Sequence, residues 1–442
     1  LFWYSSVYKD IKRVYIIFTD NLISKINNIR RDRMIKYEEH FGINIISTNL
    51  NNSTNVDFLT EDIVNDVEKF HTSIDEYKKT PLVKLDNLAS KLGVKNIFVK
   101  DESYRYGLNA FKGLGGLYAI FRIVCDKLNL DYKSTTFKDL QNKDIKEKLK
   151  DIVFVTATDG NHGKGIAWAA NKLGCKSVVF MPKGSVLTRA KAIENMGNST
   201  VTITDLNYDD AVRKAASLAD ENGWYLVQDT AWEGYEDIPN FISQGYTIMA
   251  KEALDELNEL GIEKPTHLFL QAGVGSMAGS MLGYMVNRFD KKPPITTIVE
   301  PATVACIYKS AKADDSKPHA VTGDLQTVMA GLNCGEPNTA TWPILRDYAS
   351  FYASCPDYVT ARGMRILASP LKDDKKVISG ESGAVGAGLL SMLMEKDEFE
   401  DIRRDMGLNK NSVVLIFSTE GNTDPKGYDE IVYDGRNFSP FV

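Results

Sequence analysis

Residues 152–165 read Ile152-Val-Phe-Val-Thr-Ala-Thr-Asp-Gly-Asn-His-Gly-Lys-Gly165. The stretch opens with an apolar run rich in β-branched residues, which is typical of a buried strand. It continues into a turn of short polar side chains and glycines, and then into a segment with helical periodicity, Gly163–Leu173. A strand that leads directly into a helix is half of a βαβ unit. The stretch therefore predicts a parallel sheet covered by helices.

The same alternation of strand and helix continues along the chain from about Leu82. The other apolar runs that we expect to form strands are Ile97–Lys100, Ser177–Met181, Thr200–Thr204, Trp224–Val227, His267–Gln271, Ile295–Val299 and Ser412–Phe417. The other segments that we expect to be helical are Ala110–Lys127, Leu187–Met196, Asp209–Asp220 and Asn240–Leu260. Strands separated by helices of this length indicate an α/β fold with helices on both faces of a mostly parallel sheet.

The composition narrows the class of protein. The chain has 442 residues, of which 43% are hydrophobic and 25% charged, and these values exclude a disordered or collagen-like chain. The 53 Lys and Arg residues against 59 Asp and Glu residues give a net charge of −6, which argues against a nucleic-acid-binding protein. No apolar run approaches the roughly 18 residues that a membrane-spanning helix needs. The five cysteines form no CxxC pair and the histidines show no ligand spacing, so we expect no metal site.

The loops after the strands are the places to look for a ligand site, because ligands of open α/β sheets bind beyond the carboxyl ends of the strands. The first loop runs from Lys100 to Lys112, with Asn109 as the predicted N-cap and Lys112 in the first helical turn. The positive end of a helix dipole disfavours an ammonium group, so we expect a lowered pKa for Lys112. A neutral amine suits Schiff-base chemistry, although a surface lysine is the alternative.

Three further loops carry short polar side chains or glycines. The loop Thr156–Gly165 could bind a small anion, or it could be an ordinary capped turn. The loop Gln271-Ala-Gly-Val-Gly-Ser-Met-Ala-Gly279 could cradle a phosphate, although close helix–strand packing also explains such glycines. The loop Ser418-Thr-Glu-Gly-Asn-Thr-Asp-Pro425 places a hydroxyl at a strand end. This hydroxyl could contact a ring nitrogen of a ligand, or the loop could be a turn that binds nothing.

Taken in this order, the four loops resemble those of the pyridoxal-phosphate enzymes of the tryptophan-synthase-β fold type, from about residue 80 to residue 426. The resemblance implies pyridoxal 5′-phosphate as cofactor, carried by Lys112 as a Schiff base. It also implies that Asn161 contacts the pyridine O3′ and that Thr419 faces the pyridine nitrogen. The residues implied to bind the phosphate are Gly273, Val274, Gly275, Ser276 and Met277.

The same resemblance implies two domains, each an open, mostly parallel, twisted sheet flanked by helices. We expect residues 34–118 and 240–442 to form the large cofactor-binding domain, and residues 119–239 to form a small domain inserted in it. Residues 1–33 contain seven Lys or Arg and three Asp or Glu, and Met34 is the first methionine. We expect this segment to lie outside the catalytic unit.

Two carboxylates distinguish this chain from the general pattern. Asp159 stands where most members carry Ser or Thr, and an ionised carboxylate cannot donate a hydrogen bond to a substrate carboxylate. It fits a substrate with an extra ammonium group, or a role as a base. Asp229, in Asp229-Thr-Ala-Trp-Glu-Gly-Tyr235, is a second acid just after a strand. Together with Lys100-Asp-Glu-Ser-Tyr-Arg-Tyr-Gly-Leu-Asn-Ala-Phe-Lys112, these strings resemble the diaminopropionate ammonia-lyase family.

That resemblance implies α,β-elimination of D- and L-2,3-diaminopropionate to pyruvate and ammonia by a cytoplasmic homodimer. Lys112 and Asp159 would be bases for opposite isomers, and Asp229 would orient the β-ammonium group. A serine/threonine dehydratase-like lyase is the alternative within the fold, and Asp159 argues against it. A cofactor-less binding protein is the non-enzyme alternative, and Lys112 with its phosphate loop argues against that one. Whether Cys306 and Cys334 are close enough to pair stays open.

Overall fold

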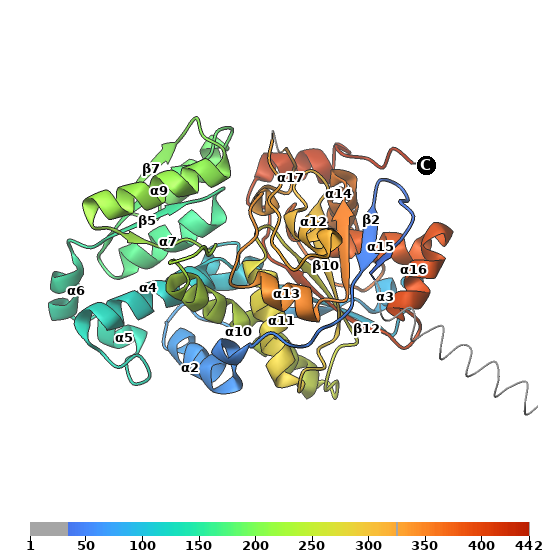
Figure 1. Ribbon diagram of the computed structural model, residues 1–442, viewed down its shortest axis with the longest axis horizontal. Helices are drawn as coiled ribbons and strands as arrows, with labels where there is room; N and C mark the ends of the chain where they lie inside the picture. The colour runs from blue at the N-terminus through green and yellow to red at the C-terminus, as the bar shows by residue number, and fades with distance from the viewer. Residues whose placement is uncertain (1–33, 324–325, 442) are drawn as a thin grey trace, which may run out of the picture.

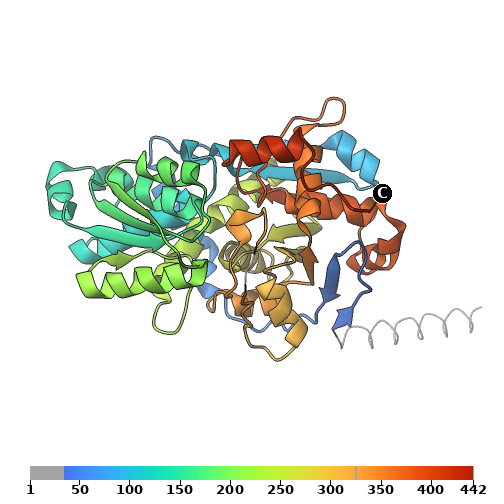
Figure 2. The same ribbon diagram turned by 90° about the horizontal axis from the view of Figure 1, so that it is seen from above.

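The computed structural model describes residues 34–323 and 326–441, so the prediction for residues 1–33 lies outside the described residues. Two sheets, each with its own covering helices, lie next to each other along the long axis of the molecule (Figures 1 and 2). Both are wholly or mostly parallel, which confirms the predicted fold class. No helix among the described residues is long and apolar enough to cross a membrane.

The larger sheet has eight strands in the order β1-β2-β11-β10-β9-β12-β4-β3. Its strands are β1 (Ile35–Lys36), β2 (Asn44–Ser47), β3 (Leu82–Lys84), β4 (Asn96–Asp101), β9 (His267–Gln271), β10 (Ile295–Pro301), β11 (Phe351–Cys355) and β12 (Val413–Ser418). The five strands in the middle run parallel, and the short strands β1, β2 and β3 pair antiparallel at the edges. This order brings the carboxyl ends of β9, β12 and β4 together.

The smaller sheet has four parallel strands in the order β7-β6-β5-β8. Its strands are β5 (Val153–Ala157), β6 (Lys176–Met181), β7 (Ser199–Ile203) and β8 (Tyr225–Leu226). All four come between β4 and β9 in the chain, so this sheet is inserted between strands of the larger one. The predicted domain boundaries near residues 119 and 239 stay a prediction.

Helices cover both faces of each sheet. Among the described residues, the helices of eight or more residues are α2 (Glu61–Thr72), α4 (Gly113–Leu128), α7 (Asn161–Lys172), α8 (Leu187–Glu194), α9 (Tyr208–Asn222), α10 (Asp237–Glu259), α11 (Ser276–Arg288), α12 (Cys306–Ala313), α14 (Asp357–Ala368), α15 (Val385–Glu395) and α17 (Pro425–Val432). One core joins α4, α10 and α11 to one face of the large sheet, and a second joins α14 and α15 to the other. Smaller cores lie under α9 and under α7 and α8 on the small sheet.

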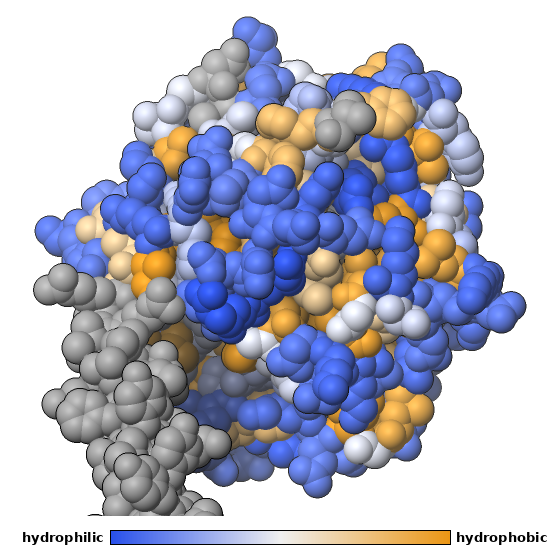
Figure 3. Space-filling view, turned by 90° about the vertical axis from the view of Figure 1, so that its right-hand side faces the viewer, coloured by the Kyte–Doolittle hydropathy of each residue, from blue (hydrophilic) through white to orange (hydrophobic). Residues whose placement is uncertain are grey.

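The eight predicted strands are all present, and the five named helical segments are helical. Four strands were not predicted: β1, β2, β3 and β11. Strand β11 reads Phe351-Tyr-Ala-Ser-Cys355 and contains no Val, Ile or Thr, so only Phe351 and Tyr352 favour a strand locally. It forms a strand by pairing between β10 and β2. On the face shown in Figure 3, hydrophobic residues lie interspersed among hydrophilic ones.

A buried ionic network fixes the chain between β4 and α4. The guanidinium group of Arg105 is fully buried and donates to both carboxylate oxygens of Glu102 and both of Glu252, at 2.8–2.9 Å. The amine of Lys100 lies 2.9 Å from a Glu252 oxygen and donates to the carbonyl of Thr80 at 2.6 Å. Because Glu252 belongs to α10, the network attaches the loop that leads to Lys112 to a helix of the core that covers one face of the large sheet.

We predict that Glu252→Ala lowers the free energy of unfolding by about 3–5 kcal/mol, because it leaves buried cations without a partner. Burial opposes ionisation of Glu252, but Arg105 outweighs it and lowers the pKa from 4.5 to about 2. This contribution is therefore complete above the unfolded-state pKa and is lost as the pH falls from 4.5 towards 2. Urea denaturation at several pH values measures both effects.

Glu256→Ala is the control, since this partly exposed carboxylate lies 3.3 Å from the Lys100 amine, which keeps Glu252 as a partner, and should change stability by less than about 1 kcal/mol.

Candidate active site

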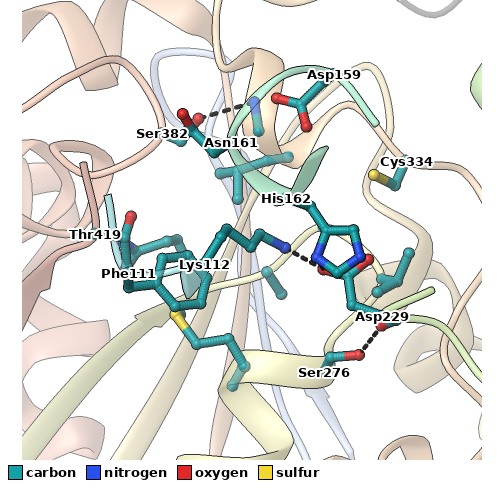
Figure 4. A pocket seen from close by; sticks show the side chains of 18 of the residues that line it. Phe111, Lys112, Asp159, Asn161, His162, Asp229, Ser276, Cys334, Ser382 and Thr419 are labelled. Atoms are coloured by element: carbon teal, nitrogen blue, oxygen red, sulfur yellow. Dashed lines mark hydrogen bonds and ion pairs between the residues drawn. The ribbon is translucent and has the colours of Figure 1, made fainter. Parts of the chain in front are cut away.

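The residues predicted for the site line one pocket (Figure 4). The pocket lies between the two sheets, where the loops after β4, β5, β8, β9 and β12 meet. The predicted residues that line it are Lys112, Asp159, Asn161, Asp229, Gly273, Val274, Gly275, Ser276, Met277 and Thr419. More than 300 residues separate the first from the last, so tertiary structure alone brings them together.

Lys112 occupies the N-cap position of α4 and not its first turn. The predicted N-cap residue, Asn109, has left-handed backbone angles (φ 61°), and its carbonyl accepts a hydrogen bond from the backbone of Gly421. The Lys112 amine lies above the rings of Phe111 and Tyr246, and it forms an ion pair with Asp229 (Figure 4). The amine is therefore oriented by contacts with distant parts of the chain.

The expected lowering of the Lys112 pKa is wrong. Burial does lower this pKa, but the attraction of the Asp229 carboxylate outweighs burial and raises it above its ordinary value. The partial positive charge at the start of a helix lowers the pKa of a nearby amine by less than a carboxylate in direct contact raises it. A prediction from local sequence could not include Asp229, which lies 117 residues further along the chain.

Asp229 is itself buried, and burial favours its neutral form. The nearby Lys112 ammonium outweighs burial and lowers the pKa of Asp229 below its usual range. Oδ2 of Asp229, the oxygen that Lys112 contacts, also accepts a hydrogen bond from the Tyr246 hydroxyl at 3.3 Å. Nδ1 of His162 lies 3.9 Å from the same Oδ2 atom. Nε2 of His162 lies 2.8 Å from the carbonyl of Val227, which holds the ring in place.

Asp159 has the opposite electrostatic character. Its pKa is raised to about 6, chiefly by burial, although Arg189 and Lys112 partly counteract this. Its Oδ2 atom is buried and has no hydrogen-bond partner among the described residues. A carboxylate that titrates near neutral pH and faces a pocket without a partner has the properties of a general base.

The glycine loop after β9 leads into the N-terminus of α11. Gly275 has φ 95°, which a residue with a side chain rarely adopts, and a Cβ atom there would lie 2.9 Å from Leu345. A Cβ atom at Gly273 would lie 3.2 Å from the Leu332 backbone, a tight contact, so Gly275 requires glycine for its backbone angle and Gly273 allows a close approach of the two segments. The loop thus presents backbone N–H groups and the start of a helix to the pocket, an arrangement that binds phosphate well.

Thr419 follows β12 and faces the pocket. Its hydroxyl oxygen accepts a hydrogen bond from Nε2 of Gln271 at 2.9 Å, and the same amide donates to the carbonyl of Phe417 at 2.8 Å. Because its oxygen already accepts from Gln271, the Thr419 hydroxyl is left with its proton to donate. It can therefore donate to an unprotonated ring nitrogen.

The pocket fits pyridoxal phosphate. It combines a lysine amine, an anion-binding helix start, a hydroxyl donor and the side-chain amide of Asn161 around one space. Other lining residues were not predicted as site residues, including Tyr208, Gln271, Cys334, Ser382 and Glu420. Gln271 and Glu420 lie within loops that the sequence already marks, whereas Tyr208 and Cys334 lie outside them. No group of three or more His, Cys, Asp or Glu residues within the described ranges is arranged to hold a metal ion.

Two cysteines lie close together beside the pocket. Cys306 and Cys334 are both buried, and Sγ of Cys306 lies 3.7 Å from the carbonyl of Cys334. In the part of the chain that the structure describes, all five cysteines are free thiols.

Comparison with known proteins agrees with this geometry. Residues 74–418 match the family model described as pyridoxal-phosphate dependent enzyme. A diaminopropionate ammonia-lyase of Salmonella typhimurium is 52% identical over 380 residues, which cover 86% of this chain and 94% of that one. The Escherichia coli diaminopropionate ammonia lyase in complex with an aminoacrylate-PLP azomethine reaction intermediate superposes with a TM-score of 0.83 at 44% identity, and the match covers 92% of this chain and 100% of that one. An L-threonine dehydratase of Staphylococcus saprophyticus is 26% identical over 282 residues, which cover 63% of this chain and 58% of that one.

The fold and the pocket thus define a pyridoxal-phosphate-dependent enzyme of the tryptophan-synthase-β fold type. Within that class, the chain belongs to the diaminopropionate ammonia-lyase family, because the identity with its members is high and extends over most of both chains.

We predict that Asp229→Asn lowers the pKa of Lys112, because burial is then no longer outweighed by a carboxylate in contact. The neutral amine would become available at lower pH. The rate at which the cofactor-free protein forms an imine with pyridoxal phosphate, measured by absorbance against pH, should therefore rise at lower pH than in the wild type. Asp209→Asn, outside the pocket lining, is the control and should follow the wild-type profile. An unchanged profile for Asp229→Asn would show that Asp229 does not set the charge of Lys112.

Proposed function

We propose that the chain catalyses the α,β-elimination of 2,3-diaminopropionate, in both D and L forms, to pyruvate and two molecules of ammonia. The observation that carries the proposal is that Asp159 and Asp229 line the same pocket as Lys112 and the phosphate-binding loop. A substrate with two ammonium groups gains from two carboxylates, whereas a simple hydroxy amino acid does not. The similarity to the diaminopropionate ammonia-lyase of Salmonella typhimurium supports the same assignment.

Each predicted residue then has a role. Lys112 holds the cofactor covalently, the amides at Gly273–Met277 bind its phosphate, and Asn161 and Thr419 contact its ring. When bound, pyridoxal phosphate supplies the electron sink that makes the α-proton of an amino acid removable. Thr419 is neutral, so it does not hold the ring nitrogen in its protonated form as a carboxylate would. This favours elimination over transamination.

The two bases act on different isomers. In Figure 4, Asp159 lies at the top of the view and the Lys112 amine lies near the centre, so the two groups approach the pocket from different directions. Lys112 removes the α-proton of one isomer, and Asp159 removes that of the other. Asp229 orients the β-ammonium group, which leaves as ammonia. The remaining enamine hydrolyses in water to pyruvate and the second ammonia.

Two other functions are disfavoured. A serine/threonine dehydratase-like reaction is not favoured, because the dehydratase match is much weaker and because Asp159 stands where a hydroxyl donor would be needed. A cofactor-less binding protein does not agree with membership of the pyridoxal-phosphate family or with the fit of the pocket to the cofactor.

We further propose that the enzyme is a cytoplasmic homodimer that acts on a small amino acid. The resemblance to the diaminopropionate ammonia-lyase family supports the dimer, and the five free thiols agree with a reducing compartment. Light scattering of the purified holoenzyme measures the mass of the assembly, and a monomeric mass would contradict the dimer.

The deciding experiment is pyruvate release from D- and L-diaminopropionate beside L-serine and L-threonine. We expect kcat/KM for both diaminopropionate isomers to exceed those for serine and threonine by at least about 100-fold, since a lost charge pair in a buried site costs about 3 kcal/mol or more. Lys112→Ala is the matched inactive variant and should also lose the visible absorption band of the bound cofactor. Preference for serine or threonine would overturn the proposed substrate.

We predict that Asp159→Asn lowers turnover of the D isomer by at least about 100-fold and that of the L isomer by less than about 10-fold, because general-base catalysis contributes about 10²–10⁴-fold. In the wild type, turnover of the D isomer should rise with pH through about 6, since the base must be ionised. Stopped-time pyruvate assays with each isomer measure both effects. Asp209 is the matched control residue, because burial also raises its pKa to about 6 but it lies outside the pocket lining. The variant Asp209→Asn should therefore leave the turnover of both isomers unchanged. Equal losses on the two isomers would contradict the assignment of one base to each.

A further inference from the structure

Glu420 is a carboxylate of the pocket to which none of the predicted roles applies. It follows Thr419 directly after β12, it is 3% exposed, and it lines the pocket. Its buried carboxylate adds a charge at the edge of the cofactor site.

Both oxygens of Glu420 accept hydrogen bonds. Oε1 accepts from the backbone N–H of Ser382 at 3.0 Å. Oε2 accepts from Nδ2 of Asn161 at 2.5 Å and from the Thr423 hydroxyl at 3.1 Å. The bond to Asn161 joins the first residue of α7, which follows β5 of the small sheet, to the end of β12 in the large sheet.

The bond to Glu420 also determines how the Asn161 amide is turned. An amide has an oxygen that accepts and a nitrogen that donates two hydrogens. A carboxylate can only accept, so the nitrogen of Asn161 must face Glu420. The second N–H of that nitrogen is then the single donor that the Asn161 side chain has left.

We infer that Glu420 is a positioning residue, which holds the Asn161 amide so that its remaining N–H is presented to the ring oxygen of the cofactor. This inference rests on the proposed contact between Asn161 and that oxygen. If the amide were turned the other way, its carbonyl would replace the donor and would repel an anionic ring oxygen. Glu420 acts through Asn161 and does not itself need to touch the cofactor.

The change Glu420→Gln tests this with little change of shape. A glutamine has one oxygen and one NH₂ group, but three donors now converge on the two carboxylate oxygens. The NH₂ group must therefore face either the fixed backbone N–H of Ser382 or the Asn161 side chain. The Asn161 amide can turn to accept from it, and the donor would then leave the ring oxygen.

We expect Glu420→Gln to weaken pyridoxal phosphate binding to the cofactor-free protein about 10-fold and to shift the visible absorption maximum of the holoenzyme. In the Asn161→Ala background, the same change should alter the dissociation constant less than about 2-fold, because the residue through which Glu420 acts is gone. Glu381→Gln is the charge control. Glu381 is buried, and burial together with the charge of Glu420 raises the pKa of Glu381 to about 7. Unlike Glu420, Glu381 is not the acceptor of the Asn161 amide. That variant should leave the absorption maximum in place.

Fluorescence titration gives the dissociation constants, and thermal denaturation of each variant verifies that it is folded. The inference would be overturned if Glu420→Gln changed the dissociation constant of pyridoxal phosphate equally with Asn161 and with Asn161→Ala. It would also be overturned if Glu381→Gln shifted the absorption maximum as much as Glu420→Gln does. The proposed function is tested separately, because pyruvate release from diaminopropionate by the wild type does not depend on either outcome. A wild type that releases pyruvate while Glu420→Gln keeps the wild-type spectrum would reject the positioning role and leave the function in place.

Discussion

The ion pair between Lys112 and Asp229 is the interaction on which the chemistry of the pocket depends. A buried ammonium group is costly unless a carboxylate compensates it, and here each group stabilises the charged form of the other. The pair joins the start of α4 to the loop after β8, so it also connects the two sheets. A lysine held in this way is at a defined place and in a defined charge state before any ligand arrives.

Two carboxylates in one pocket acquire opposite properties because their neighbours differ. Asp229 contacts an ammonium group and stays ionised, whereas the Oδ2 of Asp159 has no partner among the described residues and its pKa rises to about 6. Pairs of acids whose pKa values are driven apart in this way are how a single site provides both a permanent charge and a base. The sequence indicates that both residues are acidic, but the difference between them comes from contacts with distant residues.

The rest of the fold holds these groups in place. The Arg105 network attaches the loop before Lys112 to α10, and α10 also provides Tyr246, which donates to Asp229. Glycines at 273 and 275 let the backbone approach Leu332 and Leu345 closely, which shapes the phosphate loop. Glu420 connects the Asn161 loop to the end of β12. The pocket is thus surrounded by contacts between segments that are far apart in the chain.

The sequence by itself determined the α/β class, most of the strands, five of the helices, and the loops that carry the lysine, the polar turn, the glycines and the terminal hydroxyl. It could do so because strand and helix patterns and glycine turns are local properties of the chain. It did not predict β11, where only Phe351 and Tyr352 favour a strand locally and where the pairing with β10 and β2 is made by residues far apart in the chain. It also assigned Lys112 a lowered pKa, because the helix start is visible in the sequence and Asp229 is not. Only the tertiary structure decided the charges of the site, since electrostatic interactions depend on distance in space, and the fold alone places residues 112, 159, 229 and 420 around one pocket.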